Sequence, residues 1–161
     1  LVLLVVMWTL LSDIAYLRIE AGRDVRDIAS GWIRENVAPG SSFVTLKTYR
    51  EDRYFNPVIP ETLEHTVFYL VQGNDSQSLF RNHKFDYLVL NEYIYKSMEG
   101  LGSKHPLEHY RQFHEALANS GYRPIKELKN PVNILGVDFS HSFASHDYTI
   151  VNPGIRIYRR E

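Results

Sequence analysis

The sequence begins with LVLLVVMWTLL (Leu1–Leu11), continues in a charged and periodic segment, and reaches PGSS at residues 39–42 before Phe43 and Val44. The opening run is almost entirely apolar and is typical of the end of a transmembrane helix. Its eleven residues are fewer than the roughly 20 that a helix needs to span a bilayer core. We therefore interpret residues 1–44 as a helix leaving a membrane, a turn, and the first strand of an extramembrane domain.

Two other interpretations of the apolar run are weaker. A secretory signal would normally begin with Met and a basic region, and Leu1–Leu11 has neither. A buried helix of a soluble protein is the other alternative. Trp8 and Tyr16 would suit the aromatic belt at a membrane surface. The predicted organisation is the end of a transmembrane helix at residues 1–12 and a single extramembrane α/β domain at residues 13–161.

A long amphipathic helix is predicted over Asp13–Val37. Its apolar residues recur every three or four positions, and charged residues separate them. Gly22 and Gly31 reduce the helix propensity and mark sites of close packing or of a bend. Pro39-Gly40 ends the helix. The transmembrane segment is expected to run directly into this helix.

Strand and helix signals then alternate along the chain. Strands are predicted at residues 42–49, 85–91, 122–128 and 155–159, and a helix at residues 106–120. Residues 61–72 fit a helix, although residues 66–71 fit a strand equally well, and residues 130–152 have no clear period and are interpreted mostly as loop. This order predicts a small layered α/β domain. The apolar run at residues 85–91 favours a strand covered on both faces, and we expect the sheet to be mostly parallel.

Composition excludes several classes of protein. Eighteen Lys and Arg against nineteen Asp and Glu give a formal charge of −1 without a polybasic block, so a nucleic-acid partner is not predicted. The absence of Cys excludes disulfides, thiol nucleophiles and thiolate metal sites. The eleven Tyr fit buried or interfacial packing, with a sugar-stacking surface as the alternative.

No metal site, cofactor or catalytic residue is predicted. His105 and His109 have the spacing of metal ligands on a helix, but an HExxH motif is absent and a solvated face explains them better. A second group of potential ligands, in the segment without a clear period, has no fixed geometry: Asp138, His141, His146 and Asp147. The chain has no GxSxG motif, and its serines show no fixed relation to a His and an acid.

Candidate ligand-binding residues follow the central predicted strand. Loops after the carboxyl ends of parallel strands are where α/β domains bind ligands, and this selects Asn91, Glu92, Tyr93 and Tyr95. Gly100 and Gly102 belong to the sequence GLGSK, whose backbone amides could hold phosphate before the next helix. GLGSK lacks the third glycine of the dinucleotide fingerprint and the ending of a P-loop.

Several motifs in sequence order resemble one family. After the apolar start come ASGWIRENVAPGS at residues 29–41 and FDYLVLN at residues 85–91, then PLEHYR at residues 106–111 and PGIRIYRR at residues 153–160. Together they resemble the carboxy-terminal extramembrane domain of polytopic glycosyltransferases that use a dolichyl- or polyprenyl-phosphate sugar, the mannosyltransferase type. The resemblance covers most of the chain.

The resemblance implies a non-catalytic domain outside the cytoplasm. In that family, catalysis rests on acidic residues in an early extracytoplasmic loop of a membrane bundle, and no position of this sequence matches them. The implied location is the cell membrane, with the domain on the periplasmic or extracellular side. The implied partners are membrane lipid, an upstream transmembrane bundle, and a lipid-linked sugar or its acceptor.

Two observations leave alternatives open. Arg18, Arg23 and Arg26 closely follow the apolar run, and the positive-inside tendency would place them in the cytoplasm. Large domains translocate largely regardless of charge, and the family resemblance favours the extracytoplasmic side. The alternative function is a membrane-anchored α/β module that binds a sugar or phosphate at its strand ends.

Overall fold

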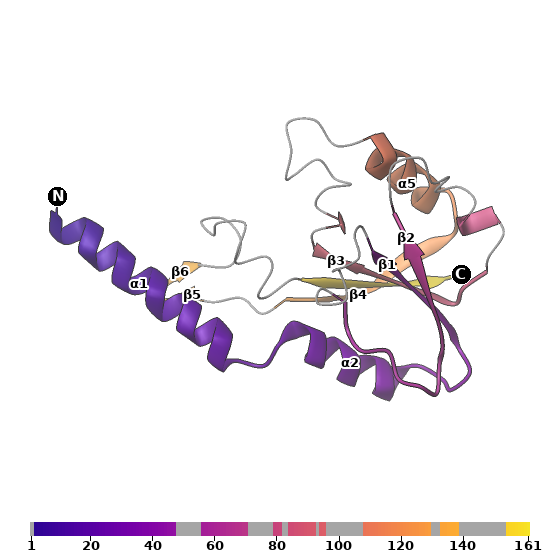
Figure 1. Ribbon diagram of the computed structural model, residues 1–161, viewed down its shortest axis with the longest axis horizontal. Helices are drawn as coiled ribbons and strands as arrows, with labels where there is room; N and C mark the ends of the chain where they lie inside the picture. The colour runs from indigo at the N-terminus through magenta and orange to yellow at the C-terminus, as the bar shows by residue number, and fades with distance from the viewer. Residues whose placement is uncertain are drawn as a thin grey trace.

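A five-stranded mixed sheet forms the centre of the chain in a computed structural model (Figure 1). The structure describes residues 2–47, 56–70, 79–81, 84–92, 94–95, 108–129, 133–138 and 154–161. The strands of this sheet, in spatial order, are β2 (Glu64–Tyr69), β1 (Ser42–Lys47), β3 (Tyr87–Asn91), β7 (Ile155–Arg160) and β4 (Tyr122–Leu128). The predicted α/β class is confirmed.

The expectation of a mostly parallel sheet is not supported. β1 pairs in parallel with β2 and with β3, whereas β7 pairs antiparallel with both β3 and β4. The physical reason is the position of the last strand. β7 enters between β3 and β4 in the opposite direction, so one half of the sheet is parallel and the other half is antiparallel.

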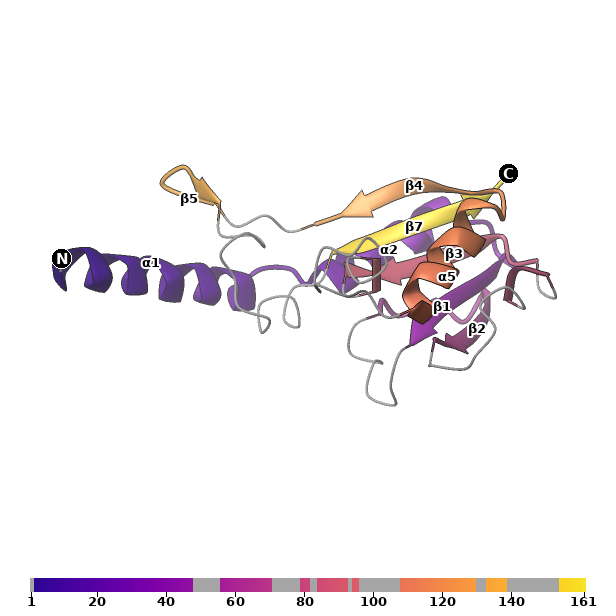
Figure 2. The same cartoon turned by 90° about the horizontal axis from the view of Figure 1, so that it is seen from above.

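Two helices cover opposite faces of the sheet (Figures 1 and 2). Helix α2 (Val25–Asn36) lies on one face, where Val25, Ala29 and Ile33 belong to a core cluster with residues of β1, β3 and β7. Helix α5 (Glu108–Ala118) lies on the other face, where Phe113 and Leu117 join a second cluster. Strand side chains alternate between the two clusters because successive residues of a strand point to opposite faces.

The central and edge strands match their sequence patterns. All five residues of β3 are buried, as the apolar run at residues 85–91 predicts for a strand covered on both faces. β4 is an edge strand with a register shift between Pro124 and Lys126, in agreement with the preference of proline for edge strands and bulges. Residues 61–72 fit either a helix or a strand in the sequence. In the structure, Glu64–Tyr69 within this segment form the edge strand β2.

The prediction of a single helix over Asp13–Val37 is wrong. The segment belongs to two helices, α1 (Val2–Ala21) and α2, with a break at residues 22–24. Asp24 has extended backbone angles (φ −62°, ψ 134°), and its side chain accepts a hydrogen bond from the Arg26 backbone N–H, so it is the N-cap of α2. The capping carboxylate and the preceding Gly22 start a new helix where the periodic pattern alone suggested continuity.

Helix α1 extends away from the α/β body (Figures 1 and 2). Its first half exposes apolar side chains at consecutive positions: Val2, Leu3, Leu4, Val5, Val6, Met7 and Trp8. Among the helices that the structure describes, none has the length and apolar character needed to cross a membrane.

A short hairpin occupies part of the segment predicted to be mostly loop. β5 (Asn133–Ile134) pairs antiparallel with β6 (Val137–Asp138), and Leu135-Gly136 forms the turn. Both turn residues have positive φ (52° and 83°), as a type I′ turn requires. The sequence pattern missed the hairpin because each strand has only two residues and the turn lacks the usual Asn-Gly signal. The rest of residues 130–152 lies outside the described part of the chain.

Candidate functional site

Three of the candidate residues lie together where β3 ends. Asn91 is the last residue of β3 and pairs with Ile155, the first residue of β7. Asn91, Glu92 and Tyr95 have exposed fractions of 1%, 0% and 1%. All three carry polar groups in the interior of the domain. Hydrogen bonds to neighbouring segments hold Asn91 and Glu92 there.

Glu92 joins the end of β3 to the start of β7. Its Oε2 accepts a hydrogen bond of 2.8 Å from the backbone N–H of Gly154. The backbone approaches closely here, because a Cβ placed on Gly154 would lie 2.6 Å from the Tyr95 hydroxyl oxygen and 3.2 Å from Glu92 Oε2. Contacts under about 3 Å are shorter than carbon–oxygen packing allows, so only glycine fits this position without a shift of its neighbours.

Asn91 and Asn56 form a second link between strands. Asn56 Nδ2 donates to the Leu46 carbonyl of β1 at 2.9 Å, and Asn91 Nδ2 lies 3.4 Å from Asn56 Oδ1. Asn91 Oδ1 accepts from the Ile94 backbone N–H at 3.1 Å. The two amides satisfy backbone groups at the carboxyl ends of β1 and β3.

Arg156 links the aromatic ring of Tyr95 to a group of charged side chains on β4 and just after it. The Arg156 guanidinium carbon lies 3.8 Å from the centre of that ring, within the range of a cation–π contact. Arg156 Nε donates to Glu127 Oε1 at 3.3 Å, and the Lys129 ammonium pairs with the same oxygen at 2.8 Å. The hydrogen bond from Lys129, together with the charges of Lys129 and Arg156, lowers the pKa of Glu127. Glu127 is therefore a carboxylate at neutral pH.

A surface cavity adjoins this cluster, and we call it the β4–β7 pocket. It has a volume of about 430 Å³ and is lined by Pro124, Ile125, Lys126, Glu127, Arg156 and Tyr158. Its lining combines two cations and one carboxylate with the side chains of Pro124, Ile125 and Tyr158. Such a surface can hold a small polar or anionic molecule against a flat side chain.

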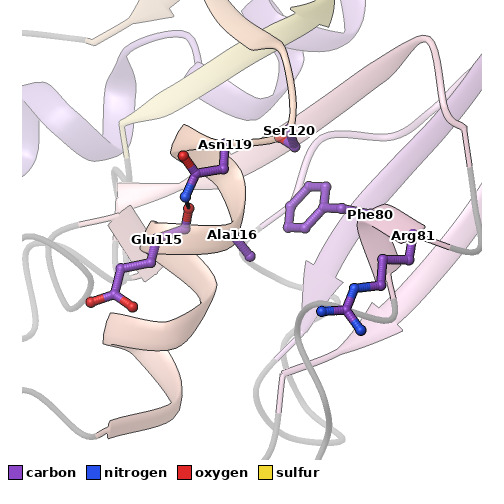
Figure 3. Close-up of a pocket in the computed structure, with 6 residues that line it drawn as sticks. All are labelled: Phe80, Arg81, Glu115, Ala116, Asn119 and Ser120. Carbon is purple, nitrogen blue, oxygen red and sulfur yellow. Dashed lines mark hydrogen bonds between the residues drawn. The ribbon is translucent and has the colours of Figure 1, made fainter.

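A second cavity lies at the carboxyl end of α5, and we call it the α5 pocket (Figure 3). It has a volume of about 440 Å³, and its lining residues are Phe80, Arg81, Glu115, Ala116, Asn119 and Ser120. Figure 3 shows the Phe80 ring directed toward the helix, and the side-chain amide of Asn119 donates to the Glu115 carbonyl at 2.8 Å. Phe80 packs on Phe113 and Tyr122, with ring centres 5.3 and 5.7 Å away.

Within the part of the chain that the structure describes, no group of three His, Cys, Asp or Glu side chains is placed to hold a metal ion. The Ser120 hydroxyl in the α5 pocket donates to the Leu117 carbonyl at 2.6 Å. Its proton is therefore directed to the helix end, whereas an activated nucleophile directs it to a general base.

The candidate residues divide into two groups. The structure brings Asn91, Glu92 and Tyr95 together, and their role toward a ligand stays a prediction. Tyr93, Gly100 and Gly102 lie outside the described residues, as do His105, His141, His146 and Asp147. For His109 and Asp138 the structure describes the backbone only.

The sequence interpretation missed Asn56, Glu127 and Arg156. Asn56 lies between the predicted strand at residues 42–49 and the ambiguous segment at residues 61–72. Glu127 and Arg156 lie in strands, where an isolated charge normally indicates a solvated face. Only the pairing of β7 with both β3 and β4 shows that Arg156 stands between Tyr95 and Glu127. The alternation within Ile155–Tyr158 was the one available signal, since it places Arg156 and Tyr158 on a common face.

Comparison of the chain with protein-family models, with curated proteins and with solved structures found no match. The functional argument therefore rests on the residues and the geometry of the chain itself.

Proposed function

We propose that this chain is a non-catalytic, membrane-attached α/β domain of the kind found in glycosyltransferases that use a polyprenyl-phosphate sugar. The observation that carries the membrane part of the proposal is the exposed apolar half of α1. The motifs described above, in their sequence order, support the glycosyltransferase part. Each step has its own test.

In the N-terminal part of α1, the exposed apolar surface extends around all sides of the helix. Residues 2–8 are consecutive, and their exposed fractions run from 44% at Trp8 to 79% at Leu3. Because successive residues of a helix point about 100° apart, seven consecutive positions cover every side of it. An interfacial helix would have one polar face. A helix that is apolar on all sides is stable when lipid or protein surrounds it.

The polar residues of α1 support the same environment. The Thr9 hydroxyl donates to the Val5 carbonyl at 2.9 Å, and the Ser12 hydroxyl donates to the Trp8 carbonyl at 2.9 Å. Each hydroxyl thereby satisfies its donor within the helix, as polar groups in hydrocarbon must. The first charged residue is Asp13. We infer that the membrane surface lies near this residue.

The proposed location of the α/β body is outside the cytoplasm, over a transmembrane bundle that carries the catalytic acidic residues. The partners are then membrane lipid, that bundle, and a lipid-linked sugar or its acceptor. The domain would stabilise the bundle or help to admit the acceptor. The described residues contain no metal cluster, and the proposal assigns them no catalytic residue.

Membrane attachment is tested by reconstituting the whole chain into phosphatidylcholine vesicles and extracting them with alkaline carbonate. The chain is expected to stay with the vesicles. Val6→Lys should release it, because a charge at the centre of an apolar helix adds about 2.5–3.5 kcal/mol to the free energy of insertion. The matched control is Val58→Lys, at a residue of the α/β body that is 75% exposed, and it should stay bound. Extraction of the unmodified chain by carbonate would refute the proposal.

The glycosyltransferase assignment is tested on the gene that encodes the chain. Many upstream hydrophobic spans, with an acidic pair in the first extracytoplasmic loop, would support it. A single span would contradict it while leaving membrane attachment intact.

A membrane-anchored binding module is the second candidate function, and the β4–β7 pocket favours it. Lys126 and Arg156 place two cations beside the flat side chain of Tyr158, an arrangement that suits a phosphate or a sugar phosphate. Titration of the whole chain in detergent with inorganic phosphate and with mannose, followed by tyrosine fluorescence, tests it. Lys126→Gln should weaken the response, whereas Arg123→Gln, on the same strand but outside the pocket lining, should not. A flat titration of the unmodified chain with both compounds would reject it.

A further inference from the structure

The tip of the β5–β6 hairpin exposes a leucine in an unusual backbone conformation. Leu135 is 88% exposed, the largest value among the exposed large apolar side chains of the described residues. Its φ of 52° is the only positive value at a non-glycine residue in the described part of the chain. A bulky residue in the left-handed region is a genuine outlier.

Turn formation alone does not account for leucine at this position. Two-residue turns of type I′ strongly favour Asn, Asp or Gly, because both central residues need positive φ. Both residues have positive φ, which Gly136 adopts readily and which Leu135, a bulky residue, adopts only at a steric cost. A leucine that is unfavourable for the turn and is surrounded by water gains nothing from the fold. An apolar environment around the tip would stabilise it, since transfer of a leucine side chain out of water is favourable.

The hairpin lies beside α1 and away from the five-stranded sheet in both views of the molecule (Figures 1 and 2). β5 contacts α1. Ala15 of α1 and Ile134 of β5 are both buried, although α1 is otherwise largely exposed. In Figure 2 the turn of the hairpin points toward the N-terminal half of α1. The hairpin that carries Leu135 therefore lies on the same side of the domain as α1, the helix whose N-terminal half exposes apolar side chains.

We propose that Leu135 inserts into the same lipid surface as the apolar half of α1, so that the hairpin is a second membrane contact of the domain. This inference rests on the proposed attachment through α1. One leucine is too weak to anchor a protein, because stable anchoring takes more than one signal. Its effect depends on α1, which holds the hairpin at the membrane and raises its effective concentration there.

A second contact has a structural consequence. A single helix leaves the attached domain free to rotate about the helix axis. Contact at both α1 and Leu135 defines which side of the α/β body faces the lipid. The orientation of the β4–β7 pocket and of the α5 pocket relative to the membrane is then fixed as well.

The chain contains no cysteine, so a single cysteine can carry an environment-sensitive fluorophore such as NBD. We would label Leu135→Cys and, as a control, Arg123→Cys near the start of β4, because β4 begins at the side of the sheet away from α1 (Figure 2). Both side chains are exposed, so labelling should leave the fold intact, which circular dichroism checks. Each labelled chain is reconstituted in phosphatidylcholine vesicles with and without brominated acyl chains. A Trp32→Phe background leaves Trp8 as an independent reporter of α1.

The label at residue 135 is expected to shift its emission to the blue and to be quenched by brominated lipid, with Trp8 quenched in parallel and the label at residue 123 unchanged. Quenching of Trp8 alone would overturn the hairpin contact and keep the attachment through α1. No quenching at either residue 135 or Trp8 would overturn both. Equal quenching at residues 123 and 135 would also overturn the hairpin contact, since the lipid would then not distinguish the tip from the far end of the domain.

Discussion

The carboxylate of Glu92 is completely buried and accepts a 2.8 Å hydrogen bond from the backbone N–H of Gly154. The two residues lie 62 positions apart in the chain. This bond fastens the end of β3 to the start of β7, where the direction of the sheet changes from parallel to antiparallel. The buried group at the end of β3, made of Asn91, Glu92 and Tyr95, therefore links the two halves of the sheet. The β4–β7 pocket opens beside it.

Gly154→Ala should destabilise the domain. The added Cβ would lie 2.6 Å from the Tyr95 hydroxyl oxygen and 3.2 Å from Glu92 Oε2, and overpacking of this kind costs about 1–3 kcal/mol. Thermal unfolding of the whole chain in detergent measures the loss. Gly31→Ala is the matched control, because a Cβ at this helical glycine meets no atom within 4 Å. It should raise the stability by about 0.5–1 kcal/mol through helix propensity, and equal effects of the two changes would contradict the argument.

Asn56→Ala should lower the free energy of unfolding by about 1–3 kcal/mol, because it leaves the buried Leu46 carbonyl without its amide donor. Chemical denaturation measures the change. Asn36→Ala serves as the control, since the Asn36 amide donates to the Trp32 carbonyl in an exposed position where water can replace it. An Asn56 variant as stable as the Asn36 variant would refute the role of this amide.

Asp24→Ala should cost about 1 kcal/mol by removing the N-cap of α2. Burial raises the pKa of Asp24, but the hydrogen bonds from Arg26 outweigh this effect and the pKa lies below its ordinary value. The carboxylate therefore stabilises the folded state at pH values above about 3.9, and this contribution is lost as the pH falls through the lowered pKa. Denaturation between pH 6 and pH 3 should show a smaller acid-induced loss in Asp24→Asn than in the unmodified chain.

His65 should make the domain less stable in mild acid. Burial, followed by the positive charge of Lys47, lowers the pKa of His65, and the His65 Nε2 atom lies 2.9 Å from the Thr45 hydroxyl. The folded state favours the neutral ring. The contribution of His65 to the free energy of unfolding is therefore fully present above about pH 6.5 and declines as the pH falls toward the lowered pKa. His65→Gln should flatten this dependence between pH 7.5 and pH 5. The effect should stay below about 1 kcal/mol, because His65 lies on an exposed edge strand where solvent screens the charge. A pH profile that is unchanged in the variant would assign the dependence to another group.

Local patterns in the sequence identified most of the regular structure. The alternation at residues 42–49 and 155–159 and the apolar run at residues 85–91 correspond to β1, β7 and β3. The helix predicted at residues 106–120 is followed by Gly121, whose φ of 79° is the left-handed conformation that commonly ends a helix. These features depend on neighbours in the chain, and sequence periodicity reports such neighbours directly.

The sequence by itself determined the α/β class, the apolar start and the buried central strand, because each follows from the spacing of residues close in the chain. Only the tertiary structure decided the mixed sheet, the break before Asp24, and the cluster of Asn56, Glu92, Gly154 and Arg156. Those features depend on contacts between segments far apart in the chain, and a local pattern carries no information about which strand lies beside which. The insertion of β7 between β3 and β4 is the decisive contact, since it sets the direction of half the sheet and places Arg156 over Tyr95.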